Sequence, residues 1–384
     1  MTADTTTFPG ESTLPGEHLT EAIISSNNLV YNFRKIQERI TDNCRIMGIV
    51  KANAYGHGAS HVSKTLESLG VSDFGVANIQ EAIRLRAEDA VSQNAAILTF
   101  CPPLPTHLPL YLRYDITATI CDHDTLYAAE SVASAHNTPL RVQVNIDTGM
   151  GRLGTSPEHA LSLLKAVEAS PYLRLEGAYT HFAQSTRQDD FTEGQLSAFR
   201  QVCSEFEHHA AKSICKHAAN SGALLFRTDA CLDMVRPGIM LYGYPPDENA
   251  NGLVDLKPVM ELRAKVIFIK DVDAGTTISY NRQWTAPSRR RIATISAGYA
   301  DGYRRSLSNH AKVFIRGVPC SQVGTVTMDQ IMVDIGNKSD IRVGDDAVLF
   351  GWNGHGAADT AKAAGTISYE ILCAVSSRVR RVFV

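Results

Sequence analysis

The sequence predicts an α/β protein with an N-terminal TIM (β/α)8 barrel followed by a smaller, mostly β C-terminal domain. The chain has 384 residues, which is enough for two domains with a sizeable apolar core. In its first 240 residues, short apolar runs alternate with longer stretches of helical periodicity. After about residue 256 the helical periodicity fades and β-rich runs follow one another. These changes divide the chain into a loose tail (1–20), a barrel (21–250) and a β domain (251–384).

The predicted barrel strands are apolar runs bounded by turn residues, at 46–50, 74–77, 96–100, 116–120, 141–146, 175–180, 214–217 and 233–236. Between them lie ASHVSKTLESLG, NIQEAIRLRAEDA, PEHALSLLKAVEAS and similar stretches, with apolar residues three and four apart. Ser156, followed by Pro157 and Glu158, is a typical helix start with Ser156 as the N-cap. Eight such units match a TIM barrel, although a doubly wound sheet also alternates.

The C-terminal domain is predicted from runs rich in β-branched residues and punctuated by Gly, Pro and Asp. These runs are MELRAKVIFIKDV, RIATISAGYA, AKVFIRGV, QIMVDI and DAVLFG. A loop that carries Pro and Asn, YPPDENANGLVDLKP (244–258), leads into them.

Composition argues against several functional classes. A net charge of −3 gives no reason to expect nucleic acid or an anionic membrane as a partner. No apolar run approaches the roughly 20 residues that a membrane span needs. The first 20 residues lack the charged and apolar regions of a signal peptide, so we expect a cytoplasmic protein.

Cysteine and histidine spacing predicts no metal site. The eight cysteines form no CxxC pair and the 13 histidines form no HExxH motif. We expect reduced cysteines that pack as small hydrophobes, among them Cys44, Cys121, Cys215 and Cys373.

Lys51 is the first candidate for chemistry. It directly follows the apolar run RIMGIV and opens the turn-rich segment KANAYGHG. A lysine at the end of a buried strand reaches water, pairs with an acid, or forms an imine with an aldehyde, and desolvation lowers its pKa toward the last use.

Further polar residues fall where predicted strands end, which is where a TIM barrel carries its active site. They are Arg152 after the fifth strand, His181 after the sixth, Asn220 and Ser221 after the seventh, and Arg236 and Gly238 after the eighth. Loops after strands seven and eight often bind phosphate in this fold, and HAANSG and RPGIMLYG offer hydroxyl and N–H donors there. A phosphorylated aldehyde cofactor bonded to Lys51 would span the barrel mouth.

GMGRLG (149–154) offers a competing interpretation, because it matches the dinucleotide-binding GxGxxG pattern and Glu176 follows about twenty residues later. It lies at the fifth strand rather than the first, however, and Arg152 stands inside the loop. We therefore favour a loop that approaches a flat cofactor.

Taken together, these segments resemble the alanine racemases, the fold-type III enzymes that use pyridoxal 5′-phosphate (PLP). The matching segments run in family order from residue 50 to 372: VKANAYGHG, DTGMGRLG, THFA, AANSG, VRPGIMLYG, ISYNRQW, GYADGY, TMDQ and ISYEIL. The resemblance implies a PLP-dependent isomerase that interconverts L- and D-alanine for cell-wall precursors.

The resemblance also implies a role for each matching residue. Lys51 matches the lysine that binds PLP covalently, and Tyr280 the second acid–base residue. Arg236 matches the arginine that faces the pyridine nitrogen, His181 the histidine that positions it, and Arg152 the residue near the phenolic oxygen and the substrate. The phosphate positions are matched by Tyr55, Ser221, Gly238, Ile239 and Tyr369. Tyr280 and the substrate-site residue Met328 would come from the other subunit, which implies an obligate homodimer.

The chemistry agrees with these roles. Inverting a Cα centre needs one acid–base group on each face, and a lysine and a tyrosine can fill these places. PLP acts as the electron sink, and an arginine at its ring nitrogen weakens that sink because guanidinium keeps its proton. Tyr280 has an ordinary pKa of about 10 and needs nearby positive charge or hydrogen bonds to act as a base; otherwise it is a packed aromatic of the β domain.

Three positions depart from the family pattern. Asn145 stands where many relatives carry a carbamylated lysine, and an anion such as chloride could replace the carbamate. Thr327 replaces a common cysteine, and Thr325 replaces a gate arginine. A serine or broad-specificity racemase is therefore an alternative. A fold-type III decarboxylase is less favoured because of Arg236 and Tyr280. A non-catalytic PLP carrier built on a single barrel is less favoured because this chain has a β domain.

Overall fold

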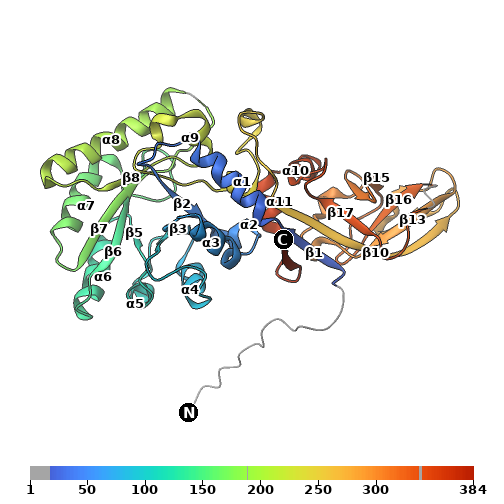
Figure 1. The fold of residues 1–384 in the computed structure, drawn as a ribbon, viewed down its shortest axis with the longest axis horizontal. Coiled ribbons are helices and arrows are strands. Elements are labelled where there is room, and N and C mark those ends of the chain that lie inside the picture. The colour runs from blue at the N-terminus through green and yellow to red at the C-terminus, as the bar shows by residue number, and fades with distance from the viewer. Residues whose placement is uncertain (1–17, 188, 337–339) are drawn as a thin grey trace, which may run out of the picture.

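The computed structural model describes residues 18–187, 189–336 and 340–384. Figure 1 shows an elongated molecule in which a helix-covered lobe lies beside a β-rich lobe. The predicted N-terminal tail, residues 1–20, lies mostly outside the described residues, and its last residue already belongs to a strand.

The first lobe is a barrel of parallel strands, which confirms the predicted fold class. Its strands are β2 (Arg45–Ile49), β3 (Asp73–Val76), β4 (Ala96–Thr99), β5 (Ala118–Ile120), β6 (Leu140–Asn145), β7 (Leu173–Tyr179), β8 (Cys215–His217) and β9 (Met234–Val235). The ring closes because β9 pairs with β2, while single bridges join Leu98 to Thr117 and Asn220 to Arg236. Each strand overlaps a predicted one, since the predicted runs are buried and bounded by turns.

Helices follow the barrel strands and cover the outside of the ring (Figure 1). They are α3 (Ala59–Ser68), α4 (Ile79–Ala87), α5 (Leu108–Arg113), α6 (His123–Ala135), α7 (Pro157–Ala169), α8 (Asp190–Ala210) and α9 (Ser221–Phe226), with α1 (Ser26–Gln37) before the first strand. Ser156 occupies the N-cap position of α7 as predicted, but its side chain makes no capping hydrogen bond.

The second lobe is an antiparallel sheet with one parallel edge pair. Its strand order is β13 (Arg290–Ile295), β16 (Ile331–Gly336), β15 (Val318–Gln322), β14 (Lys312–Ile315), β17 (Asp346–Phe350), β10 (Met260–Val272), β1 (Thr20–Ile24) and β18 (Arg380–Phe383). The long strand β10 also pairs with β13, which closes part of the sheet into a ring. The short hairpin β11 (Thr277–Ile278) and β12 (Trp284–Thr285) stands apart from this sheet.

Strand β1 joins the two ends of the chain. It lies within the stretch assigned to the barrel by sequence, yet it pairs antiparallel with β10 and parallel with β18 in the second lobe. Such pairing across more than 200 residues leaves no local trace in the sequence. The other domain boundaries stay a prediction.

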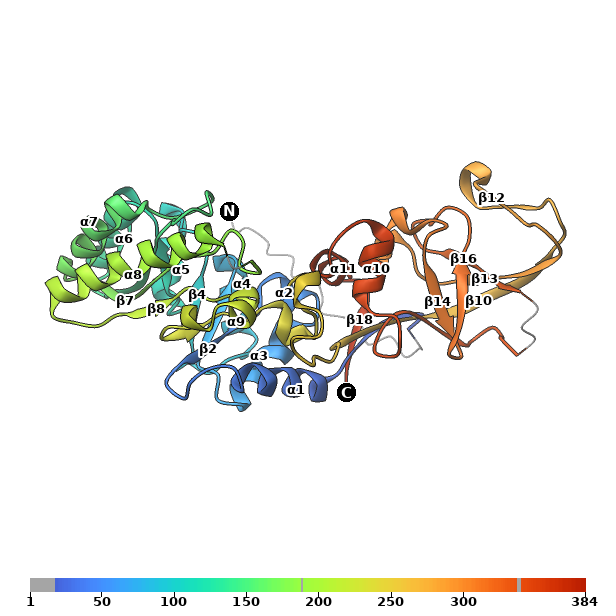
Figure 2. The same cartoon turned by 90° about the horizontal axis from the view of Figure 1, so that it is seen from above.

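Two helices of the second lobe return toward the barrel. Figures 1 and 2 show α10 (Ala357–Ala364) and α11 (Ser368–Ala374) between the lobes, and α11 packs against the segment that follows β2. Arg381 of β18 also donates to the carbonyl of Gly56 at 3.0 Å. The second lobe thereby contributes side chains to the barrel mouth.

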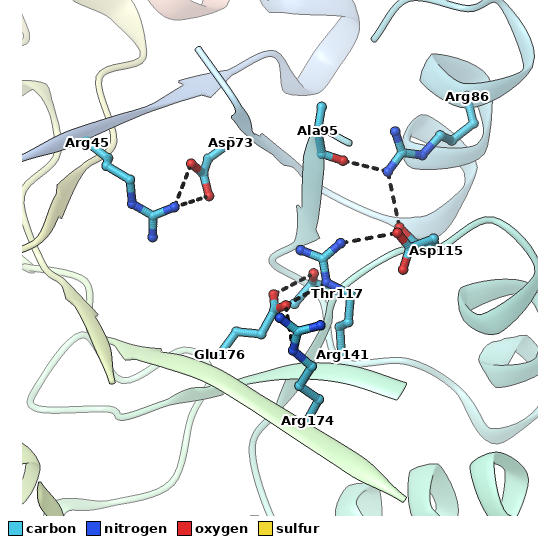
Figure 3. A network of polar contacts seen from close by, with 9 residues as sticks. All are labelled: Arg45, Asp73, Arg86, Ala95, Asp115, Thr117, Arg141, Arg174 and Glu176. Atoms are coloured by element: carbon cyan, nitrogen blue, oxygen red, sulfur yellow. Dashed lines mark hydrogen bonds and ion pairs between the residues drawn. The ribbon is translucent and has the colours of Figure 1, made fainter. Parts of the chain in front are cut away.

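A charged network closes the other end of the barrel (Figure 3). Arg45 donates to the Asp73 carboxylate at 2.9 and 3.1 Å, and Arg141 donates to Glu176 at 2.6 Å. Arg141 also donates to Asp115 at 3.2 Å. Charged pairs at this end act in stability, which leaves the carboxyl ends of the strands for chemistry.

Candidate active site

A cavity of about 500 Å³ opens at the carboxyl ends of the barrel strands. Every residue that the sequence placed around a cofactor lines it: Lys51, Tyr55, Arg152, His181, Asn220, Ser221, Arg236, Gly238, Ile239 and Tyr369. They come from five strand ends of the barrel and from α11 of the second lobe. Tyr280 and Met328, which were expected from another subunit, do not line the cavity of this chain.

Lys51 opens an unusual turn, α2 (Lys51–Tyr55). The four residues after Lys51 have φ between 52° and 54°, and none of them is glycine. L-residues disfavour this left-handed conformation by about 1–2 kcal/mol each, so surrounding contacts must hold the turn. The Glu81 carboxylate accepts from the N–H of Ala52 and of Ala77, both at 2.8 Å. The sequence indicated a turn-rich segment here but not its left-handed conformation, because the usual signal for that conformation is glycine.

The surroundings of Lys51 favour its neutral amine. Burial lowers its pKa, and the nearby charges of Arg152 and Arg236 lower it further. Glu81 acts in the opposite direction. A neutral amine is both a nucleophile toward a carbonyl and a base, as the sequence predicted for this residue.

Arg236 is fixed at the floor of the cavity by its two terminal nitrogens. One donates to the carbonyl of His217 at 2.8 Å, and the other to the carbonyls of Thr180 and Ala218 at 2.7 and 3.0 Å. Among the described residues, no hydrogen bond involves its Nε. Burial lowers the pKa of Arg236 to about 10, so the side chain remains a cation at neutral pH. The Nε–H is therefore free to donate to an acceptor in the cavity.

His217 is a site residue that sequence reasoning missed. Arg236 donates to its Nδ1 at 2.8 Å, and since guanidinium only donates, Nδ1 must be the unprotonated nitrogen. Its Nε2–H then donates to Gln143 Oε1 at 2.6 Å. Burial lowers the pKa of His217 well below its ordinary value, which keeps the ring neutral beside the cation. His217 opens the HAANSG segment, which had been interpreted only as a phosphate site.

His181, expected to position Arg236, makes a weaker contact with it. Its Nδ1 lies 3.4 Å from a terminal nitrogen of Arg236. Burial, together with Arg236, Arg152 and Lys51, lowers the pKa of His181 to about 3. The ring is thus a neutral, flat wall of the cavity.

The far side of the cavity is lined by hydrogen-bond donors that suit an anion. Ser221 Oγ accepts from the N–H of Gly238 at 3.0 Å, which leaves its own proton available. A Cβ at Gly238 would lie 2.5 Å from the hydroxyl oxygen of Tyr55, so only glycine leaves this space open. Burial raises the pKa of Tyr55 and of Tyr369, so both hydroxyls keep their protons. Together these groups can hold a phosphate.

The GMGRLG loop is held by its own carboxylate. Asp147 accepts from the N–H groups of Gly149 and Gly151 at 3.0–3.1 Å. In a dinucleotide site these donors would face a pyrophosphate. The loop therefore serves to carry Arg152 to the cavity, where Asn145, bonded to Leu153 O at 3.3 Å, also lies.

Cys373 corrects one expectation from the sequence. It was expected to pack as a core thiol, but it is exposed and lines the cavity. It stands four residues after Tyr369 on α11, and residues at this spacing share one helix face. Cys101 also lines the cavity, whereas Cys44 and Cys121 are buried as expected.

Tyr280 and Met328 lie on the second lobe and point to solvent. Their exposures are 69% and 52%, so Tyr280 is not the packed aromatic of the alternative interpretation. Tyr280 follows β11, and Figure 2 shows this hairpin, labelled at β12, at the end of the β-rich lobe far from the barrel. The chain cannot bring its own Tyr280 to its own cavity.

The described residues contain neither a membrane-spanning helix nor a cluster of metal-binding side chains. No described helix is long and apolar enough to cross a membrane. In the same part of the chain, no three His, Cys, Asp or Glu side chains gather as a metal site.

Comparisons with known proteins identify a family. Residues 24–246 match the model of the alanine racemase N-terminal domain, and residues 259–383 match that of the C-terminal domain. The chain is 55% identical over 369 residues to the alanine racemase of Chlorobaculum tepidum, covering 96% of each protein. It is 40% identical to that of Treponema denticola, covering 95% of this chain and 98% of the relative.

Solved structures give the same result. The alanine racemase of Clostridium difficile 630 superposes with a TM-score of 0.90 at 35% identity, covering 96% of each chain. That of a D-cycloserine-producing Streptomyces lavendulae gives a TM-score of 0.88 at 31% identity, covering 96% of this chain and 98% of the other.

Proposed function

This chain belongs to the alanine racemase family and is an isomerase of the two alanine enantiomers; we propose that it acts with PLP bound at Lys51 and with Lys51 and Tyr280 as its acid–base pair. One observation carries the proposal. A half-buried lysine with a lowered pKa, a buried arginine with a free Nε–H and a group of hydroxyls suited to a phosphate line one cavity.

The cavity suits each end of PLP. Ser221, Tyr55, Tyr369 and the backbone at Gly238 would hold the phosphate, and the Lys51 amine would hold the aldehyde carbon. The Nε–H of Arg236 would face the ring nitrogen. When bound, PLP withdraws electrons from the substrate Cα and makes its proton removable.

Lys51 and Arg236 have different roles in the proposed reaction. The lowered pKa of Lys51 favours the neutral amine, which can accept a proton from one face of the substrate. Arg236 keeps its own proton and would donate only a hydrogen bond to the ring nitrogen of PLP, which would moderate the electron withdrawal. Moderate withdrawal suits proton removal and return better than chemistry that needs a long-lived carbanion.

The second base is proposed to come from another copy of the chain. Racemisation needs an acid–base group on the face opposite Lys51, and Tyr280 is exposed on the second lobe. In a two-fold homodimer each subunit can present Tyr280 and Met328 to its partner's cavity. A homodimer with two shared sites follows.

We also propose a cytoplasmic enzyme that supplies D-alanine for cell-wall precursors. All eight cysteines are free, which is typical of proteins from a reducing compartment. Because the chain matches the models of both family domains, a carrier built on a single barrel has no support. Arg236 argues against the decarboxylase.

The testing experiment is a racemisation assay on purified protein with added PLP, with L-alanine, L-serine, L-lysine and L-arginine in parallel. Alanine should turn over much faster than the others. Comparable turnover of serine or a basic amino acid would assign a specificity role to Asn145, Thr325 and Thr327. Absence of racemisation for every substrate by PLP-loaded protein would overturn the proposal.

A further inference from the structure

The turn that carries Tyr280 is strained. Ser279 has φ 66° and ψ −174°, a conformation that essentially only glycine adopts, and Asn281 and Arg282 have φ of 60° and 53°. Three non-glycine residues around one exposed tyrosine are thus held away from their ordinary conformations. Contacts from elsewhere must hold this turn in place.

Thr325 supplies those contacts. Its hydroxyl donates to the carbonyl of Tyr280 at 2.8 Å, and the hydroxyl of Ser279 donates in return to the carbonyl of Thr325 at 2.6 Å. Thr325 is only 2% exposed, so water competes little for these bonds. The two backbones are in close contact, because a Cβ at Gly324 would lie 2.7 Å from the carbonyl oxygen of Ile278.

The same segment leads to Met328. Thr327 Oγ1 donates to the carbonyl of Gln330 at 2.8 Å and accepts from its N–H at 3.1 Å, which closes the turn that presents Met328. Thr325 thus contacts the Tyr280 turn directly and stands three residues before Met328 in the same segment.

We propose that Thr325 is a positioning residue for racemisation, whose hydroxyl fixes the Tyr280 turn so that the phenol is placed before substrate binds. The inference rests on the proposed role of Tyr280 as the second base. A hydroxyl that acts through Tyr280 affects proton transfer on the Tyr280 face and leaves the Lys51 face unchanged. A residue that served only the fold would affect both faces alike.

Isotope effects distinguish the two faces. The enantiomers of alanine have equal free energy, so any variant must lower kcat/KM equally in both directions. With α-deuterated substrates, however, one enantiomer reports proton removal by Lys51 and the other reports proton removal by Tyr280. Misplacing Tyr280 makes its own step slower and raises the isotope effect for its own enantiomer.

The experiment compares variants of the full-length holoenzyme. Thr325→Val removes the hydroxyl at nearly constant shape, Thr325→Ser keeps it, and Ser279→Ala removes the reciprocal bond. Thr360→Val is the matched control, because Thr360 is also 2% exposed in the second lobe and its hydroxyl contacts Gly356 O and His355 Nε2, just before α10. Tyr280→Phe identifies the enantiomer that reports the Tyr280 step.

Thr325→Val should lower kcat/KM by about 10- to 100-fold, the range for a catalytic group displaced by up to 1 Å. It should raise the isotope effect for the enantiomer marked by Tyr280→Phe, as should Ser279→Ala. Thr325→Ser and Thr360→Val should remain within about threefold of the parent enzyme, a smaller loss than a displaced catalytic group gives.

Two results overturn the inference alone: a Thr325→Val enzyme as active as Thr360→Val, or isotope effects raised equally for both enantiomers. If Thr325→Val fails to fold, Ser279→Ala tests the inference instead: its isotope effect should be raised only for the enantiomer that reports the Tyr280 step. An unimpaired Tyr280→Phe enzyme would overturn the proposed role of Tyr280 itself and this inference with it.

Discussion

Arg236 donates a 2.8 Å hydrogen bond to Nδ1 of His217, a neutral histidine that in turn donates to Gln143. The arrangement fixes one edge of the guanidinium through a ring whose tautomer is set by the guanidinium itself, because a guanidinium can only donate. Because His217 is neutral, its Nδ1 can accept from the guanidinium, which a protonated imidazole ring could not do. With both terminal nitrogens of Arg236 bonded, its Nε–H has no partner among the described residues and remains available to an acceptor in the cavity.

His217→Leu is expected to leave a buried guanidinium nitrogen with one acceptor fewer. The free energy of unfolding should fall by about 1–3 kcal/mol, the usual penalty for a buried polar group left unpaired. PLP affinity should fall as well, because Arg236 loses its orientation. Urea unfolding and PLP titration measure the two effects, with His209→Leu on the exposed face of α8 as control. Unchanged PLP affinity would assign His217 to stability alone.

Lys51→Ala should abolish racemisation, because both the bond to PLP and one base are lost. Borohydride reduction of the parent holoenzyme followed by peptide mass spectrometry should place the cofactor on Lys51. The exposed Lys64→Ala variant is the control and should be labelled and active like the parent. Racemisation that survives in Lys51→Ala would refute the mechanism.

Shared sites can be tested by mixing two inactive chains. Lys51→Ala and Tyr280→Phe chains, co-expressed in equal amounts, form a mixed dimer that retains one intact site if each site draws on both subunits. Random pairing then restores about a quarter of the parent activity. If each chain supplied both residues to its own site, the mixture would stay inactive.

Glu81→Gln should lower the pKa of Lys51 further. The carboxylate raises that pKa by favouring the protonated amine, and the amide removes this charge. The neutral amine is the form that captures PLP. In the Glu81→Gln apoenzyme, the rate of PLP capture should therefore begin to rise at a lower pH than in the parent apoenzyme. Glu81→Asp keeps the charge and should leave the pH dependence in place. A shift toward higher pH would contradict the electrostatic assignment.

Features with a short-range signal were predictable. Apolar runs bounded by turns located each barrel strand, and polar residues at strand ends located the cavity from Lys51 to Arg236. The resemblance then supplied Tyr369 and Tyr280, whose places depend on distant parts of the chain.

What sequence reasoning missed depends on tertiary structure. The left-handed turn after Lys51 contains no glycine, so only the contacts of Glu81 and other neighbours reveal it. His217 lies at a strand end like many other polar residues, and its partner Gln143 is 74 residues away. The exposure of Cys373 follows from how α11 docks on the barrel, which local hydrophobicity does not report.

The place of β1 has a consequence for synthesis of the chain. This strand leaves the ribosome before the barrel, but its neighbours β10 and β18 follow more than 200 residues later. The barrel can fold while β1 remains unpaired. The second sheet can be completed only after β18 has left the ribosome. Its last pairing therefore joins the earliest and latest segments of the fold, which makes translation order part of how this protein reaches its native state.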